Sequence, residues 1–363
     1  MWRINLFLFP LFCLFSTGLE YSHYHFPRTS CLVCIGEHQS IHVLEVDPEL
    51  YEIKPMKALD NGIGRESVLS IAERSGAVAS INGGFFSIGG TLDGRACGAL
   101  KIHDWIALPF KPRGCIGWSS TNQNPKIDRL WVHLTGSYDS TPISIHGFNR
   151  ARKEGEAILY TPQFHRTTLT RPDGIELVVQ GGIIQTIETN GSAKIPDNGF
   201  VLSIQKAHPL YHSFVQGLPL TVSLRIETLL GMEDWDSLEY IVGGTPILIM
   251  DNAKITDFAP EQTLQTFLTN RHARTAVGIL PNGHWLFVVV DKTDFCDGMT
   301  IPELVDFMAK LGCIKALNLD GGGSSTMVYE GSVKNSPRGD EEESQGKNIV
   351  RRVSDAIVIK SRH

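Results

Sequence analysis

The sequence predicts a strand-rich fold in which a few helices pack against sheets. Along most of the chain, runs of residues typical of strands dominate. The 35 glycines are somewhat many for 363 residues and indicate frequent turns and close backbone approaches. Two segments, residues 65–76 and 300–312, stand out as helices. Together these observations place sheets at the centre of the fold.

Two segments illustrate the strand prediction. Residues 41–47, IHVLEVD, alternate apolar and polar side chains, which is typical of a strand with one buried face. Residues 284–291, HWLFVVVD, are nearly all apolar and lie between a turn sequence and an aspartate. This continuous apolar run predicts a strand that is buried on both faces.

The two helix predictions rest on end signals. Residues 65–76, RESVLSIAERSG, gather apolar side chains on one face and end at Gly76, a C-terminal cap. In residues 300–312, Thr300 and Glu303 form a capping box and Gly312 closes the end. The apolar residues between them fall on one face, as in a helix that packs on a sheet.

Composition excludes one function class. The hydrophobic content of 42% and the charged content of 20% are those of an ordinary globular protein. A formal net charge of −6 and the lack of a basic cluster argue against a general nucleic-acid binder.

Residues 1–18 have the pattern of a secretory signal peptide. Arg3 precedes an apolar stretch, and the small residues Ser16 and Gly18 follow it. A membrane anchor is the alternative, but the apolar stretch is shorter than the roughly 20 residues of a spanning helix. We therefore predict export, a mature N-terminus near Leu19 and no membrane association after cleavage.

The cysteines indicate structural roles. Cys13 lies in the predicted signal peptide, which leaves six that an exported protein could pair or keep as free thiols. Cys31 and Cys34 form a CLVC motif. A zinc site needs a second such pair and a redox motif needs a helix after a strand, so neither is predicted.

Paired glycines follow four apolar runs: AVASINGGFF, IELVVQGGIIQ, EYIVGGTPILIM and IKALNLDGGGSS. Each pair alone is explained by a turn. Four pairs with polar residues attached predict strand ends that converge on one cleft.

The segment DGGGSST, residues 320–326, is the strongest candidate for chemistry. It lacks the lysine of a phosphate-binding P-loop and the glycine spacing of a nucleophile elbow. A hairpin turn is the simple interpretation. The alternative is a nest in which backbone N–H groups of residues 321–323 face an anion, beside Asp320 and the Ser324 hydroxyl.

Residues 270–297 carry a second set of polar groups. Arg274 precedes an apolar run, and its guanidinium suits an anionic ligand. For Arg271 a solvated position is the simpler interpretation, and His272 shares a face with Arg274 if the strand begins that early. The acidic segment at residues 332–347 reads as an exposed loop.

Five motifs resemble the phosphodiester glycosidase family. They are INGGFF, GGTPILI, ARTAVG, the run from Gly298 to Gly331 that contains NLDGGGSST, and RRVSDAIVI. The resemblance covers residues 80–360 and is dense from 242 onward, whereas residues 101–236 match loosely. It implies one α+β domain over residues 19–363, an extended, twisted, mixed or antiparallel sheet flanked by helices with its cleft at the glycine-rich strand ends.

The resemblance also implies a site and a reaction. The reaction is hydrolysis of the sugar C1–O bond of a sugar-1-phosphodiester, which releases free sugar and a phosphomonoester. Asp320, Asp291 and Arg274 would be catalytic, with nucleophile and base unassigned between the aspartates. The substrate-binding residues would be Asn82, Gly244, Thr245, Thr275, Asn318, Gly321, Gly322, Gly323 and Ser324.

Two departures from the family pattern stand in this site. Ala273 replaces a proline before Arg274. Lys292 and Thr293 stand where the family has glycine and arginine, and neither reproduces a guanidinium fork. This change favours an altered substrate, or a non-catalytic module that binds sugar phosphates or cell-wall polymers.

The proposed reaction needs only a few carboxylate groups in its active site. A phosphate leaving group is already a stable anion, so it needs neutralisation more than protonation, while a carboxylate stabilises the oxocarbenium-like transition state. No cofactor is required, and the aspartates leave room for a divalent cation without demanding one. Cleavage of the P–O bond by two metals is a third possibility, but the sequence lacks the His and Asp clusters that it needs. The expected partner is a small or polymeric sugar-phosphate substrate, with no nucleic acid.

Overall fold

The computed structural model describes residues 18–26, 38–121, 123–229, 231, 234–339 and 350–362. Within them the chain forms 24 β-strands and three α-helices. The α+β prediction is therefore wrong, because the molecule is mostly β and consists of four sheets rather than one sheet flanked by helices. The physical reason lies in residues 101–236, whose short apolar runs form strands and no α-helix.

The central sheet is antiparallel throughout and has seven strands. In spatial order they are β1 (Leu19–Phe26), β2 (Gln39–Val46), β20 (Trp285–Val290), β19 (Arg274–Ile279), β21 (Lys315–Asn318), β17 (Ile247–Met250) and β18 (Ala253–Lys254).

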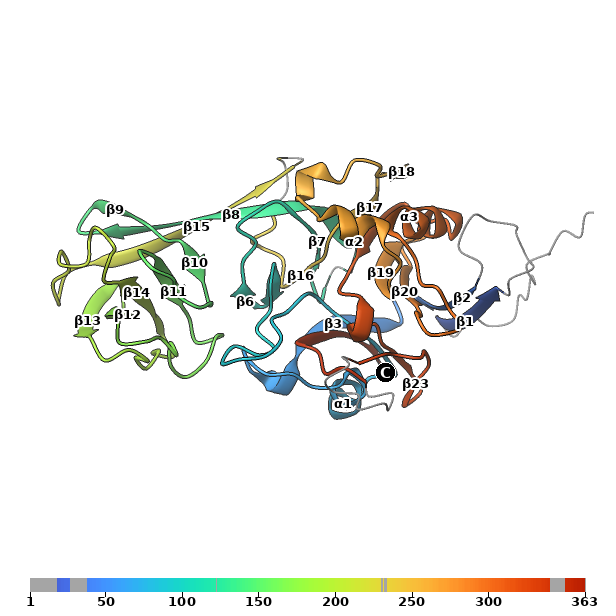
Figure 1. Ribbon diagram of the computed structural model, residues 1–363, viewed down its shortest axis with the longest axis horizontal. Helices are drawn as coiled ribbons and strands as arrows, with labels where there is room; N and C mark the ends of the chain where they lie inside the picture. Colours follow the sequence, from blue (N-terminus) through green and yellow to red (C-terminus); the bar gives the residue numbers. More distant parts are fainter. Residues whose placement is uncertain are drawn as a thin grey trace, which may run out of the picture.

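The long sheet takes its name from its longest strand, β8. Its strands are β15 (Leu220–Thr228), β8 (Lys126–Tyr138), β7 (Arg113–Trp118), β16 (Tyr240–Gly243), β5 (Leu100–Ile102) and β6 (Asp104–Ala107), with β9 (Thr141–Ser144) on β8. Strands β8 and β15 run side by side toward one end of the molecule (Figure 1).

That end carries the distal sheet: β10 (Gly147–Phe148), β11 (Ala157–Tyr160), β14 (Gly199–Gln205), β12 (Gly174–Gln180) and β13 (Ile183–Glu188) (Figure 1). The fourth sheet, here the C-terminal sheet, contains β23 (Ser332–Val333), β22 (Met327–Tyr329), β4 (Ala79–Asn82), β24 (Asp355–Ser361) and β3 (Tyr51–Lys57).

Strand β20 is buried on both faces, as its apolar run predicts. Phe287 and Val289 pack into the core shared with the long and C-terminal sheets, and Val288 and Val290 into the core beneath α3. Strand β2 was predicted to have one buried face, but both faces are buried. Its polar residue His42 is tolerated inside because it has hydrogen-bond partners.

Both predicted helices are confirmed. Helix α1 (Val68–Ser75) ends at Gly76, whose φ of +66° suits a residue without Cβ. Helix α3 (Ile301–Lys310) has the capping box of Thr300 and Glu303. The five-residue α2 (Gln265–Thr269) is too short for a helical period and was not predicted. No helix in the described ranges has the length and apolar content to cross a bilayer.

The structure tests the prediction about the cysteines in part and does not test the predicted signal peptide. The predicted signal peptide and the CLVC motif lie outside the described residues. Cys97, Cys115, Cys296 and Cys313 are free thiols, so the free-thiol alternative holds for these four.

Candidate active site

Three of the four glycine-marked strand ends meet in space. The Asn82 side chain, at the end of β4, donates through Nδ2 to the Asp320 carbonyl oxygen at 2.8 Å. The Asn318 side chain, at the end of β21, donates to the Thr245 carbonyl oxygen at 2.7 Å. The fourth pair, residues 181 and 182, connects β12 to β13 in the distal sheet, so there the simple turn interpretation was correct.

The buried polar residues of this junction hold its loops together. Asn82 Oδ1 accepts from the Thr275 hydroxyl at 2.8 Å and from the Thr326 backbone N–H at 3.1 Å. Asn82, Thr275 and Asn318 are fully buried. They therefore lie beneath the surface of the site and position the loop that carries Asp320.

Gly244 and Thr245 also support the junction. A Cβ on Gly244 would lie 2.2 Å from the Asn318 carbonyl oxygen, so only glycine permits this packing. The Thr245 hydroxyl donates to Glu261 at 3.0 Å and lies 3.0 Å from the Thr263 hydroxyl. These contacts explain both residues without a ligand.

The glycine loop after β21 differs from the predicted nest. The Gly321 N–H donates to the Asp320 carboxylate at 2.9 Å, and the Gly322 N–H donates to the Ala273 carbonyl oxygen at 2.8 Å. Residues Gly322–Ser324 then form one 3-10 turn. Two of the three glycine N–H groups are thus used inside the protein, because the loop packs against the segment that precedes β19.

Gly323 lies against a guanidinium group. A Cβ on Gly323 would be 2.6 Å from Cζ of Arg351, so the absence of a side chain lets Arg351 approach the loop. Arg351 also donates through Nη1 to the Ser324 hydroxyl at 3.3 Å. The loop therefore brings a cation next to Asp320.

Of the two predicted catalytic aspartates, Asp320 is the one whose pKa is raised. Burial raises its pKa to about 7, although a hydrogen bond from Ser324 and the charge of Arg351 lower it, and nearby Asp355 adds to the increase. As a residue, Asp320 is partly buried. A carboxyl group with a pKa near 7 is suited to proton transfer at neutral pH.

Asp355 is the second carboxylate of the site. It begins β24, is buried, and accepts a 2.8 Å hydrogen bond from the Gly84 N–H of the NGGFF motif. Burial raises its pKa, and the charge of Lys57 acts in the opposite direction. Asp355 thus ties the NGGFF loop to the C-terminal sheet and places negative charge near Asp320.

Arg274 is in the wall of the site and is 1% exposed. Its Nε donates to the Met299 carbonyl oxygen at 2.8 Å, and its Nη2 donates to the carbonyl oxygens of Phe267 and Asn270 at 2.8 and 2.9 Å. Burial lowers its pKa to about 10. These bonds fix the α2 segment, whereas the sequence predicted an anion-binding role for the same group.

Asp291, at the end of β20, is held in a dense set of hydrogen bonds. Oδ2 accepts from Ser40 at 3.0 Å and from His42 at 3.1 Å, and Oδ1 accepts from the Asn335 amide and the Ser336 N–H at 3.0 Å each. Burial acts to raise its pKa, but these donors outweigh burial and the pKa is lowered.

The partners of Asp291 extend its network. The His42 ring contacts the Tyr21 hydroxyl at 2.8 Å and stacks on His23. Asn335 was predicted to lie in an exposed loop, but it is buried and bridges Asp291 to the Ser325 carbonyl oxygen. Asp291 therefore contacts the glycine loop through Asn335, and its hydrogen bonds do not involve Asp320.

Lys292 and Thr293, which depart from the family pattern, use their side chains in bonds to nearby backbone groups. Lys292 donates to the Arg271 carbonyl oxygen at 2.6 Å, and the Thr293 hydroxyl accepts from the Phe295 N–H. Arg271, for which solvation was the simpler interpretation, instead bonds Glu303 and the Gly298 carbonyl oxygen. His272 lies outside β19.

Sequence analysis missed Arg351 and Asp355. Both are part of RRVSDAIVI, one of the motifs that carries the family resemblance, at the start of an apolar strand. Two charged residues at the start of a strand whose first five residues are buried were the available signal. Asp320, the glycine loop, Ser324, Arg351 and Asp355 now form the candidate site.

Comparison with known proteins assigns the chain to a family. Residues 173–360, more than half of the chain, match the model of the phosphodiester glycosidase family. The chain belongs to this family. Candidate residues Arg274, Asp291, Asp320, Arg351 and Asp355 all lie in the matched range of this phosphodiester glycosidase homologue.

Relatives of this family member are distant. An uncharacterised Rickettsia conorii protein is 28% identical over 233 residues, which is 61% of this chain and 77% of that protein. The Bos taurus N-acetylglucosamine-1-phosphodiester alpha-N-acetylglucosaminidase is 37% identical over 82 residues, 21% of this chain and 16% of the bovine enzyme.

Solved structures share the fold. A hypothetical protein from Synechocystis superposes with a TM-score of 0.79 at 20% identity, covering 95% of this chain and 62% of that one. A candidate exported protein of Burkholderia pseudomallei gives a TM-score of 0.75 at 23% identity, covering 89% and 74%. The zebrafish N-acetylglucosamine-1-phosphodiester alpha-N-acetylglucosaminidase catalytic domain gives 0.50 at 16%, covering 96% and 85%.

The described residues were also compared with the pattern of a metal site. Within the described part of the chain, no three His, Cys, Asp or Glu side chains are grouped so that they could hold a metal ion.

Proposed function

We propose that this protein hydrolyses the sugar C1–O bond of a sugar-1-phosphodiester. Membership of the phosphodiester glycosidase family supports a hydrolase of this type. The observation that carries the proposal is the placement of the Asp320 carboxyl group, whose pKa burial raises to about 7, beside the cation Arg351.

The two groups supply what the reaction needs. Departure of the phosphate builds positive charge at C1, which the ionised carboxylate of Asp320 stabilises. Water adds to C1, its proton passes to the carboxylate, and the electron pair of the broken C1–O bond leaves with the phosphate. Arg351 neutralises that phosphate, and no acid is required to protonate it.

Arg351 takes the anion-binding role that the sequence gave to Arg274. Its guanidinium lies against Gly323 and bonds the buried Ser324 of the loop that carries Asp320. Arg274, with three backbone carbonyl partners, supports the wall of the site. Asp291 positions the loop from behind through Asn335.

Product analysis tests this proposal. The purified protein is incubated with the methyl diester of N-acetylglucosamine 1-phosphate, and both products are identified. Free N-acetylglucosamine with methyl phosphate supports C1–O cleavage. Sugar 1-phosphate with methanol would instead mean that the P–O bond is broken, and the proposed mechanism would be wrong.

A second candidate function is a non-catalytic module that binds sugar phosphates or cell-wall polymers. The position of Lys292 favours it, because this residue, which replaces part of a family motif, bonds the Arg271 backbone. Binding of the same diester without any turnover, by wild-type protein at neutral pH, would select this function over hydrolysis.

We also propose that the protein is exported. Residues 1–18 carry the signal pattern, and the first described strand, β1, begins at Leu19. A Burkholderia structural neighbour that is a candidate exported protein is consistent with this proposal. N-terminal sequencing of protein from the native host should find a start near Leu19, and a start at Met1 would contradict it.

A further inference from the structure

A cavity of about 570 Å³ lies at the distal sheet, and none of the candidate active-site residues lines it. Its walls come from Tyr160 at the end of β11 and from three loop segments: residues 89–92 after β4, residues 151–154 between β10 and β11, and residues 164–173 between β11 and β12. The volume is within the roughly 300–1,000 Å³ of small-molecule sites.

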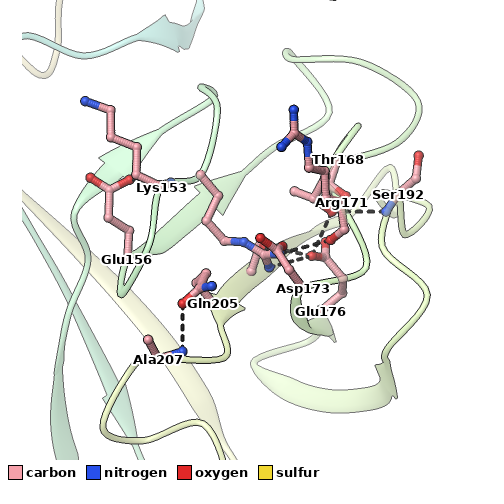
Figure 2. A network of polar contacts seen from close by, with 12 residues as sticks. Lys153, Glu156, Thr168, Arg171, Asp173, Glu176, Ser192, Gln205 and Ala207 are labelled. Carbon is pink, nitrogen blue, oxygen red and sulfur yellow. Dashed lines mark hydrogen bonds and ion pairs between the residues drawn. The ribbon is translucent and has the colours of Figure 1, made fainter.

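One wall of the cavity is fixed by a buried arginine. The Arg152 side chain is 2% exposed and donates through Nη1 to Glu176 at 3.1 Å and to the Ser203 hydroxyl at 2.5 Å. Through Nη2 it donates to the Arg171 carbonyl oxygen at 3.0 Å and to Asp173. Figure 2 shows Asp173 and Glu176 gathered around this centre, while the side chains of Lys153 and Arg171 extend away from it.

Such a network adds little to stability, because desolvation of the charges offsets their attraction. It does hold the wall in one geometry. The wall also includes Leu169 in the left-handed region, at a φ of +52°, which is costly for a leucine. A rigid, strained wall around a large cavity is typical of a binding site that is formed before its ligand arrives.

Charges around the cavity balance. Three cationic and three anionic side chains line it or lie directly beneath it: Arg152, Lys153 and Arg171, and Glu154, Asp173 and Glu176. With no net charge, the cavity gives no electrostatic preference to an anion or a cation. The charged groups instead offer hydrogen-bond donors and acceptors, together with the exposed Thr91 hydroxyl.

The apolar residues of the lining exclude two ligand classes. Tyr160 and Phe164 are each 1% exposed, so neither presents a ring face on which a nucleobase could stack. The Tyr160 hydroxyl donates to the Arg150 carbonyl oxygen at 2.5 Å and is turned into the protein. A lining that mixes donors and acceptors also disfavours a lipid chain, because bound lipid would leave buried polar groups unpaired.

We propose that this cavity binds an uncharged saccharide, whose hydroxyls pair with Arg171, Asp173 and the Thr91 hydroxyl. A saccharide presents donors and acceptors in every direction, which matches a lining of both kinds. The proposal concerns binding alone and does not depend on the reaction proposed at Asp320.

The loop after β4 connects the two sites. Its base, at Gly84, bonds Asp355 of the candidate active site, and its tip, at Gly89 and Thr91, forms the cavity wall. A saccharide in the cavity therefore holds the tip of a loop whose base contributes to the active site. Slower amide exchange in residues 89–92 is a direct signature of occupancy.

The test uses the full chain with maltotriose, cellotriose and triacetylchitotriose as neutral probes and inorganic phosphate as the anionic probe. Binding is measured by titration calorimetry at low and high salt, and location by hydrogen exchange. We expect at least one trisaccharide to bind with little salt dependence and to protect residues 89–92 and 168–173.

A pair of arginine variants locates the interaction. Arg171→Ala removes a cavity donor and should weaken the trisaccharide about tenfold, the effect of losing a hydrogen bond to a charged group. Arg166→Ala removes an exposed arginine of the same segment that does not line the cavity, and should leave affinity unchanged. Asp320→Asn should also bind the trisaccharide normally.

Three outcomes would overturn the proposal. These are absence of binding by all three trisaccharides, equal weakening by both arginine variants, and protection that is confined to residues 320–326. Salt-sensitive binding of inorganic phosphate that Arg171→Ala abolishes would show that the cavity is an anion site instead. The melting temperature of each variant confirms that it is folded.

Discussion

Asp320 and Asp291 stand in comparable places in the central sheet and have opposite environments. Each follows the last residues of a buried strand, β21 and β20, and β19 lies between these strands. Asp291 accepts four hydrogen bonds and its pKa is lowered. Asp320 has fewer donors, and burial raises its pKa to about 7.

The difference shows how one residue type serves two roles. A carboxylate with all its lone pairs occupied is stabilised as an anion and transfers protons poorly. A carboxylate short of donors is a stronger base and is available to a substrate. We therefore propose that Asp320 carries the chemistry and that Asp291 positions the glycine loop.

The same substitution at both aspartates gives the largest expected difference. Asp320→Asn should reduce kcat about 1,000-fold, within the range for removal of an acid–base group, while the fold is retained. The amide oxygen can still accept the Gly321 N–H. Steady-state rates with the methyl diester measure this effect, and a loss of less than about tenfold would exclude Asp320 from the chemistry.

Asp291→Asn should act on stability instead. Its amide nitrogen must face two of the four present donors, which leaves buried groups unpaired and lowers the free energy of unfolding by about 2 kcal/mol. Urea denaturation of both variants measures it. If Asp291→Asn abolished turnover without destabilising the protein, the comparison would be reversed.

Much of the fold was predictable from local patterns. The capping box of α3, the glycine end of α1 and the buried strand β20 all follow from short-range rules. The division into four sheets was not predictable, because the pattern of one strand does not indicate which other strand pairs with it. His42 shows the limit: its polar character suggested an exposed face, and only the arrival of Asp291 from 249 residues away makes its burial tolerable.

The site was predictable in its residues more than in their roles. The sequence indicated that Asn82, Thr245, Asn318 and Asp320 come together, and hydrogen bonds join Asn82 to Asp320 and Asn318 to Thr245. It could not show that Nε and Nη2 of Arg274 donate to backbone carbonyl oxygens, because two of these oxygens belong to the α2 segment, which has no clear pattern in the sequence. Arg351 was missed for a similar reason, since its position against Gly323 depends on tertiary packing.

The two pKa shifts predict opposite pH effects. Asp320 binds its proton more tightly in the folded state than at its ordinary pKa of 3.8, so its contribution to stability is present at low pH and is lost between about pH 4 and 7. Asp291 contributes stability at neutral pH that is lost as pH falls through its lowered pKa.

Activity should follow the ionisation of Asp320. In the proposed mechanism the ionised carboxylate stabilises the charge at C1 and accepts the proton of water. We therefore expect kcat/KM to rise with pH and to level off above an inflection near 7. Arg351→Gln removes a charge that lowers this pKa, so the inflection should move upward. A pH–rate series on both proteins checks this, and a wild-type inflection near the ordinary value of 3.8 would show that another group controls the rate.

The smallest expected effects separate two adjacent glycines of the loop beside Asp320. A Cβ on Gly323 would lie 2.6 Å from the Arg351 guanidinium and 2.5 Å from the Arg338 carbonyl oxygen, so Gly323→Ala must displace Arg351. We expect KM for the diester to rise about tenfold, as for loss of one charge-assisted contact.

Gly322→Ala is the matched control for this loop. A Cβ at Gly322 meets no atom within 4 Å, but its φ of +60° strains any other residue, so the variant should lose about 1 kcal/mol of stability and keep its KM. Kinetics and urea denaturation of both variants separate the two effects. If Gly322→Ala raised KM as much as Gly323→Ala, the ligand would occupy the open side of the loop, and phosphate recognition would belong to the loop backbone rather than to Arg351.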